Sequence, residues 1–118
     1  MNIYIICPVR NIDKVDNDII EDYVYELEEK HGHEVHFPPR DVDQVDPTGN
    51  RICQEHRQAM LSCDEVHIFW DTNSKGSHFD FGMAYSLNKK IKLIKTYQDD
   101  TKDKSYLKVI KYEENRFV

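Results

Sequence analysis

The sequence predicts an α/β fold in which helices cover both faces of a mainly parallel sheet. Apolar, β-branched runs that suit buried strands alternate along the chain with segments whose apolar residues recur at helical spacing. At 118 residues the chain is long enough for one hydrophobic core and too short for two ordinary domains. We therefore expect residues 1–118 to fold as a single domain.

The first part of the chain is expected to form a strand, a helix and a second strand. Residues 2–7, NIYIIC, are a nearly continuous β-branched and aromatic run, which is typical of a strand covered on both faces. A helix with one apolar face follows, with Asp13 or Asp16 as its N-cap and Gly32 as its stop. Residues 33–37, HEVHF, alternate like a short strand, which a pair of prolines ends because proline cannot donate to a sheet ladder.

The middle of the chain is expected to add a loop, a helix and a strand. Residues 38–50 contain three prolines and a glycine, which predict a loop. An apolar face at helical spacing then predicts a helix that starts near Thr48 or Asn50 and ends before Asp64. Residues 65–70, EVHIFW, predict the third strand.

The last part of the chain opens with the turn-forming residues 71–77, DTNSKGS. A helix from about Phe79 to Asn88 and a strand at residues 91–94 are expected next. Residues 106–112, YLKVIKY, fit either a strand or a helix, and we prefer a strand. Because right-handed crossovers join strands that alternate with helices, this order predicts a mainly parallel sheet of flavodoxin-like or Rossmann-like form.

Composition narrows the classes of protein that the chain could represent. The formal charge of −6 argues against non-specific binding to nucleic acid, for which a basic surface is expected. The run IYIIC is too short for a signal segment or a membrane span, so we expect no membrane partner. Cys7, Cys53 and Cys63 form no CxxC pair and are odd in number, so we expect reduced, buried thiols in a cytoplasmic protein.

One loop contains the residue types of an anion-binding site. Parallel sheets bind ligands beyond the carboxyl ends of their strands, and this rule selects the loops after the first three strands. In the third of these loops, Ser74, Gly76 and Ser77 supply hydroxyl donors and an open backbone just before a helix. The same residues also fit an ordinary polar loop between a strand and a helix, because they lack the spacing of a known phosphate-binding motif.

Asp80 lies between Phe79 and Phe81, in the opening turn of the third expected helix. The helix N-terminus favours its ionised form, whereas aromatic neighbours disfavour that form in a dry site. A partly desolvated carboxylate suits a nucleophile that attacks a sugar anomeric carbon, and the alternatives are a ligand-binding group and a plain helix cap. We expect His56 and His78 near the same end of the sheet, and no metal site, because the histidines lack metal-ligand spacing.

Together these segments resemble the nucleoside 2-deoxyribosyltransferase superfamily, which includes the 2′-deoxynucleoside 5′-phosphate N-hydrolases. IYIICPVRN is similar to the family's first strand and turn, with their tyrosine and arginine. RQAMLSCDEVHIFW and SKGSHFDFGMA are similar to a helix, a strand opened by an aspartate and a loop of the form S-x-G-x-x-x-E-x-G-x-A, and NKKIKLI is similar to the next helix exit and strand. The resemblance covers most of residues 1–95 and implies one deoxyribosyltransferase-like domain.

The resemblance implies roles for particular residues. Asp80 occupies the place of the family's glutamate, which attacks C1′ of the deoxyribosyl group, and Tyr4 matches a tyrosine beside that nucleophile. His56 stands where the family usually has an aspartate that helps to handle the leaving base. Ser74 and Gly76 match positions that hold the 5′-phosphate in the N-hydrolase branch.

Three further residues complete the expected site. Ser77 and Arg10 are additional candidates to receive the phosphate. Trp70 is a candidate to line the base pocket, although a tryptophan at the end of a strand more often packs in a core or an interface. The chain also departs from the family pattern, because an aspartate at position 80 is about one C–C bond shorter than a glutamate, and a shift of that size can cost roughly a hundredfold in rate.

We therefore expect the protein to cleave or transfer the N-glycosidic bond of a (deoxy)nucleoside 5′-monophosphate or related nucleotide, without a cofactor. The alternative is a catalytically inactive protein of the same fold that binds a nucleotide for sensing or sequestration. A third class is an interaction module with no ligand, since fold alone does not decide function. Family members commonly complete the pocket with a neighbouring subunit, so the resemblance implies a homodimer or higher homo-oligomer.

Overall fold

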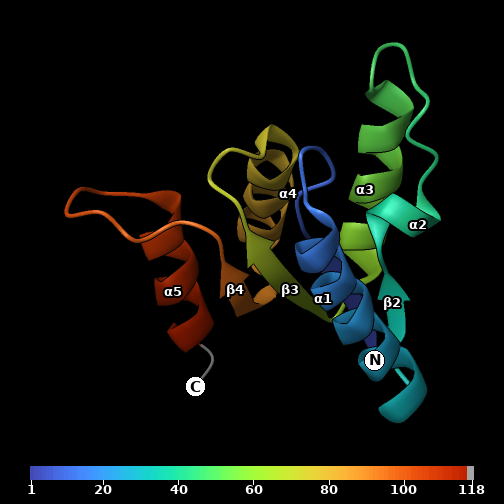
Figure 1. Cartoon of the computed structure of the whole chain (residues 1–118), viewed down its shortest axis with the longest axis horizontal. Coiled ribbons are helices and arrows are strands. Elements are labelled where there is room, and N and C mark those ends of the chain that lie inside the picture. Colours follow the sequence, from blue (N-terminus) through green and yellow to red (C-terminus); the bar gives the residue numbers. More distant parts are fainter. Residues whose placement is uncertain (117–118) are drawn as a thin grey trace.

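The computed structural model describes residues 1–116, in which strands and helices alternate along the chain (Figure 1). In order, the elements are β1 (Asn2–Ile6), α1 (Lys14–Tyr25), the π-helical turn η1 (Glu26–Lys30), β2 (Glu34–His36), α2 (Pro38–Asp41), α3 (Asn50–Ser62), β3 (Glu65–Trp70), α4 (Lys75–Ser86), β4 (Lys90–Thr96) and α5 (Tyr106–Arg116). None of the helices within residues 1–116 combines the length and the apolar character that crossing a membrane requires.

The four strands form one parallel sheet in the order β2-β1-β3-β4, which confirms the predicted α/β architecture. β1 is an inner strand, because Ile3 pairs with Val35 of β2 and with Glu65 of β3. Parallel neighbours are joined by crossovers, so the carboxyl ends of all the strands lie at the same end of the sheet. The residues that follow β1 and β3 are therefore close to each other in space.

Each face of the sheet has its own apolar core. Tyr4 and Ile6 point to the face that carries α3, α4 and α5, whereas Ile3 and Ile5 point to the face that carries α1. This two-sided burial explains the continuous apolar run of β1, because alternate residues of a strand point to opposite faces. Burial of each isoleucine stabilises the fold by about 1.5–3 kcal/mol.

The preference for a strand at residues 106–112 is wrong, because this segment belongs to helix α5, which lies beside β4 (Figure 1). Leu107 and Ile110 are buried in the core on the α4 side of the sheet, whereas Tyr112 is 73 % exposed. The two buried residues are three positions apart, which is helical spacing. The Ser105 side chain caps the helix by accepting a backbone N–H of its first turn.

Two boundaries differ from those that the sequence predicted. Helix α4 begins at Lys75 rather than near Phe79, because Ser74 acts as its N-cap. Asp80 consequently lies in the second turn of α4 and not in its opening turn. The segment that was expected to be a loop starts with the short helix α2, whose first residue, Pro38, has no N–H to leave unpaired at that position.

Other local expectations agree with the structure, with one exception. Asp13 is the N-cap of α1, since its carboxylate accepts a backbone N–H of the first turn. Gly32 ends the first helical segment at a φ of +68°, a left-handed conformation that glycine adopts readily. Cys7 and Cys63 are buried, but Cys53 is exposed on α3, so the expectation of three buried thiols is wrong for that residue.

Side chains cover backbone groups on the two outer strands of the sheet. On β2, the guanidinium of Arg40 donates to the carbonyl oxygen of Val35 at 3.1 Å. On β4, the carboxylate of Glu114 accepts the backbone N–H of Leu93. Helices α2 and α5 thus place charged groups against the two edges of the sheet.

On the α1 face, His67 of β3 belongs to a chain of polar contacts. Its Nδ1 atom lies 2.6 Å from the hydroxyl of Tyr23, and its Nε2 atom lies 3.0 Å from the carboxylate of Glu65. Burial lowers the pKa of His67 below its ordinary value of 6.5, although Glu65 acts in the opposite direction. A neutral ring that donates to Glu65 and accepts from Tyr23 satisfies all three groups.

The substitution Ile110→Ala is expected to lower the free energy of unfolding by about 2–5 kcal/mol, because it removes buried apolar contacts and leaves a cavity. Tyr112→Ala changes an exposed residue of the same helix and is expected to cost less than about 0.5 kcal/mol. Chemical denaturation followed by circular dichroism measures both values. Equal large costs at the two positions would contradict a helix, because residues 110 and 112 share a face only in a strand.

Acid is expected to destabilise the protein through His67. The unfolded chain takes up this proton near pH 6.5 and the folded chain only at a lower pH, so stability is lost as the pH falls from 6.5 through the lowered pKa. In His67→Gln, the free energy of unfolding should fall less between about pH 7.5 and 5.5 than in the wild type. His31→Gln, at an exposed ring, is the control, and an unchanged pH slope in His67→Gln would assign the effect to other groups.

Candidate functional site

Three elements bring their side chains together around Asp80, which is 5 % exposed on α4. The hydroxyl of Tyr4, from β1, donates to Oδ2 of Asp80 at 2.9 Å. The Nδ1 atom of His56, from α3, lies 3.0 Å from Oδ1 of the same carboxylate. Each carboxylate oxygen therefore has its own partner, and the three residues that the sequence analysis grouped as catalytic candidates are in direct contact.

Protonation states around Asp80 follow from burial and charge. The pKa of the Tyr4 hydroxyl is raised far above its ordinary value, first by burial and then by the negative charge of Asp80. The hydroxyl therefore stays protonated and acts as the donor. Burial, followed by the same charge, raises the pKa of the Cys7 thiol to about 12, so this thiol carries almost no thiolate at neutral pH. The Asp80 carboxylate is thus a better candidate nucleophile than the Cys7 thiol.

The N-terminus of α4 is capped by a serine and not by Asp80. The Oγ atom of Ser74 accepts the N–H of Ser77 at 3.3 Å, and no acidic residue lies in the first turn. The start of α3 is different, because Asp46 already accepts the N–H of Ile52 there at 3.1 Å. Of these two helices, α4 is therefore the one whose N-terminus has no acidic side chain against the positive end of its dipole.

The remaining phosphate-binding candidates lie at the same end of the sheet. Gly76 is exposed in the first turn of α4, and a Cβ atom added to it would meet no atom within 4 Å, so the space beside this backbone is open. Ser77 is 2 % exposed, with its hydroxyl oriented inside the protein. Arg10 is exposed in the loop after β1, and no hydrogen bond within residues 1–116 joins it to the first turn of α4.

Trp70 is part of the hydrophobic core. Its side chain is 1 % exposed, and its ring centroid lies 4.7 Å from that of His78 and 5.9 Å from that of Phe81. Alternate residues of β3 point toward α4, which explains why the last residue of this strand packs under the helix. The buried ring of Trp70 therefore has almost no surface that a ligand could contact in this structure.

His36 is a neighbour of the cluster that the sequence analysis did not select. It is the last residue of β2 and pairs in register with Tyr4. Its ring centroid lies 5.0 Å from that of Tyr4 and 6.2 Å from that of His56. The signal that could have found it is its place at the carboxyl end of a strand, where parallel sheets bind their ligands.

Buried polar atoms without hydrogen-bond partners concentrate around Asp80. They are Nε2 of His36, Nε2 of His56 and Oγ of Ser77, and the hydroxyl of Tyr97 is the one other such atom in residues 1–116. Buried polar groups are nearly always paired, so this concentration indicates a place that receives a polar ligand or water. Within residues 1–116, no group of three or more His, Cys, Asp or Glu side chains is placed to hold a metal ion.

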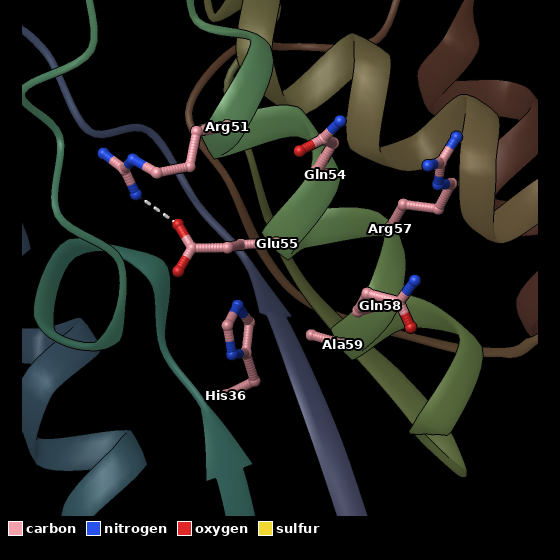
Figure 2. A pocket seen from close by; sticks show the side chains of 7 residues that line it. All are labelled: His36, Arg51, Gln54, Glu55, Arg57, Gln58 and Ala59. Carbon is pink, nitrogen blue, oxygen red and sulfur yellow. Dashed lines mark hydrogen bonds and ion pairs between the residues drawn. The ribbon is translucent and has the colours of Figure 1, made fainter.

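A cavity of about 490 Å³ lies beside His36, along the exposed side of α3 (Figure 2). Its lining residues are His36, Arg51, Gln54, Glu55, Arg57, Gln58 and Ala59. Figure 2 shows the His36 ring directed from the end of β2 toward α3, close to the ion pair of Arg51 and Glu55. Six of these seven residues have polar or charged side chains, but most of the surface that they turn toward the cavity is apolar.

The fold has counterparts among solved structures, although no protein-family model and no curated protein matches the sequence. The CMP N-glycosidase of Clostridium botulinum is 20 % identical, with a TM-score of 0.68, over 98 % of this chain and 84 % of that one. A 2-deoxyribosyltransferase from the psychrotolerant bacterium Bacillus psychrosaccharolyticus is 16 % identical, with a TM-score of 0.62, over 98 % of this chain and 91 % of that one. The chain therefore has the α/β fold that these two enzymes share.

Ser74→Ala is expected to lower the free energy of unfolding by about 1 kcal/mol, because it removes the N-cap of α4. Ser74→Asp keeps an oxygen that can accept the same N–H and should stay within about 0.5 kcal/mol of the wild type. Urea denaturation measures both variants, with the exposed Ser86→Ala as a control near the end of the same helix. If Ser74→Asp were as unstable as Ser74→Ala, the capping role would be incorrect.

Proposed function

We propose that this protein cleaves or transfers the N-glycosidic bond of a (deoxy)nucleoside 5′-monophosphate or related nucleotide. The observation that carries the proposal is the buried Asp80 carboxylate, held between the Tyr4 hydroxyl and the His56 imidazole, on the helix whose N-terminus is open to an anion. The fold supports the same reading, because one similar structure is named as a CMP N-glycosidase and the other as a 2-deoxyribosyltransferase.

In the proposed reaction, an oxygen of Asp80 forms a bond to C1′ of the sugar while the bond from C1′ to the base nitrogen breaks. The base leaves with the bonding electron pair and takes up a proton. Water or a second base then attacks C1′, and the Asp80 carboxylate is released. Tyr4 holds one carboxylate oxygen in place and, because its pKa is raised, does so as a neutral donor.

His56 is proposed to handle the proton of the leaving base. Its Nδ1 atom faces Asp80, so its Nε2 atom is left for the substrate or for water. In its charged form the imidazole donates a proton to the base, and in its neutral form it accepts one from the attacking water. A histidine suits both steps, because it changes its charge near neutral pH.

The first turn of α4 is proposed to hold the 5′-phosphate through Ser74 and Gly76, with Ser77 and Arg10 as further donors. Gly76 and Asp80 are four residues apart on α4, which is about 6 Å along a helix axis. This is the length scale that separates the phosphate from the anomeric carbon of a nucleotide. We also propose, on the resemblance, that residues 1–118 are one deoxyribosyltransferase-like domain that works as a homodimer or higher oligomer.

A specific observation favours a second candidate, a nucleotide-binding protein without catalysis. Both oxygens of Asp80 already have hydrogen-bond partners, which reduces the nucleophilicity of a carboxylate. The aspartate is also shorter than the glutamate of the family that the sequence resembles. In this case the same groups would bind the ligand, and the bond to the base would remain intact.

Incubation of the wild type with a panel of nucleoside and deoxynucleoside 5′-monophosphates is expected to release free base, measured by chromatography. Asp80→Ala should reduce that rate by at least about a thousandfold, because it removes the nucleophile. Asp99→Ala, in an exposed loop, is the matched control. Turnover that survives Asp80→Ala unchanged would refute the nucleophile, and binding of a nucleotide without base release would support the second candidate.

The substitution Ser74→Asp distinguishes the capping role of residue 74 from its proposed role in binding the phosphate. It retains the capping oxygen but adds a negative charge where the phosphate is proposed to bind, so nucleotide monophosphates should bind more weakly while the protein remains folded. Calorimetric titration with a nucleoside and with its monophosphate measures the effect, and equal affinities in the wild type and the variant would argue against a phosphate at this turn.

A further inference from the structure

His36 is the residue of the cluster to which the proposed reaction gives no role. It ends β2, on the side of β1 opposite to β3 and the α4 N-terminus. Tyr4 and His56 both contact its ring, so it reaches the same group of side chains that holds Asp80. A residue with only a packing function there would be expected to be apolar, because a buried imidazole nitrogen without a partner is costly.

Two ring nitrogens in this part of the site lack partners, and they come from different elements. They are Nε2 of His36 on β2 and Nε2 of His56 on α3. Burial keeps His36 neutral by lowering its pKa, against the opposing charges of Asp41 and Asp80. A neutral imidazole has one donor nitrogen and one acceptor nitrogen, so it can pair with either kind of group on a heterocycle.

The arrangement of the strands gives the two ends of a nucleotide different surroundings. The proposed phosphate site follows β3, the carboxylate contacts Tyr4 on β1, and His36 ends β2, so these groups follow the order of adjacent strands. The cavity beside His36 extends along the exposed side of α3 (Figure 2), and of the side chains grouped around Asp80 it is His36 that lines it. A sugar centred at Asp80 with its phosphate at α4 would therefore direct its base toward His36.

We propose that His36 is a specificity-determining residue that hydrogen-bonds the polar edge of the heterocyclic base. This inference rests on the proposed function, because it assigns the substrate's base to one side of the same site. His36 and His56 both hydrogen-bond the base, and the cavity along α3 accommodates the substituents of the base ring. Tyr4 supports the His36 ring by contact with it.

The test is the substitution His36→Phe, which keeps a ring against Tyr4 and removes both nitrogens. For the preferred nucleotide, kcat/KM should fall on the order of tenfold, because a polar edge of the base loses its partner. The ratio of kcat/KM between cytidine and uridine monophosphates, or between adenosine and inosine monophosphates, should move toward one. Inhibition by ribose 5-phosphate, which has no base, should remain unchanged.

Two further variants separate recognition from structure. His36→Gln keeps a donor and an acceptor and should restore part of the base preference. His31→Phe, at an exposed ring, should change neither rate nor preference. A His36→Phe variant with the wild-type ratio between bases, or with an equal loss of affinity for nucleotide and for ribose 5-phosphate, would overturn the inference.

The same variants distinguish this inference from the proposed function. Base release by the wild type tests the reaction alone, whereas the ratio between bases tests His36. If the wild type binds nucleotides without cleaving them, calorimetry replaces the rate, and a loss of affinity in His36→Phe that is confined to the intact nucleotide supports the role of His36. A wild type that binds neither nucleotide nor ribose 5-phosphate would overturn both.

Discussion

The contact of Asp80 with Tyr4 and His56 links β1 to helices α3 and α4 and places a carboxylate where little solvent reaches it. An unpaired carboxylate at that depth would cost several kcal/mol, and the two partners offset much of this cost. The partners are separated from Asp80 in the sequence, Tyr4 by 76 residues and His56 by 24. The cluster therefore exists only when the sheet has formed, and the positions of the surrounding polar groups depend on it.

The strand order spreads these polar groups across the site. The α4 N-terminus follows β3 and provides backbone donors and a positive dipole end, whereas β2 ends in a neutral imidazole. The Asp80 cluster includes Tyr4 of β1, the strand between β2 and β3. A ligand with an anionic group at one end and a polar ring at the other matches this distribution, which is a property of the whole sheet.

Much of the architecture could be predicted from the sequence because local patterns carry it. The continuous apolar run of residues 2–7 reports burial on two faces, and the Asp13 cap and the Gly32 stop bound a helix. Residues 106–112 were assigned to the wrong element because their short apolar pattern fits both periods, and only packing against the core selects the helix. Turn-forming residues before Phe79 concealed the start of α4, since serine and glycine suit a cap as well as a loop.

The residues of the candidate site that lie in one segment of the sequence could be predicted. Those that reach the site only through the pairing of two strands could not. Ser74, Gly76 and Asp80 lie within one short segment, so their common placement on α4 follows from sequence spacing. His36 reaches the cluster only because β2 pairs with β1 at Tyr4, and no local pattern encodes that register. Trp70 lies at the predicted strand end, but tertiary packing turns its ring into the core.

The side chains on the outer strands have a consequence for how copies of this chain can meet. Arg40 hydrogen-bonds a backbone carbonyl of β2, and Glu114 hydrogen-bonds a backbone N–H of β4. An incoming strand would need these backbone groups for pairing. Charged groups at these positions also oppose the approach of another apolar strand. Lengthening of the sheet by a second molecule is thus disfavoured at both edges.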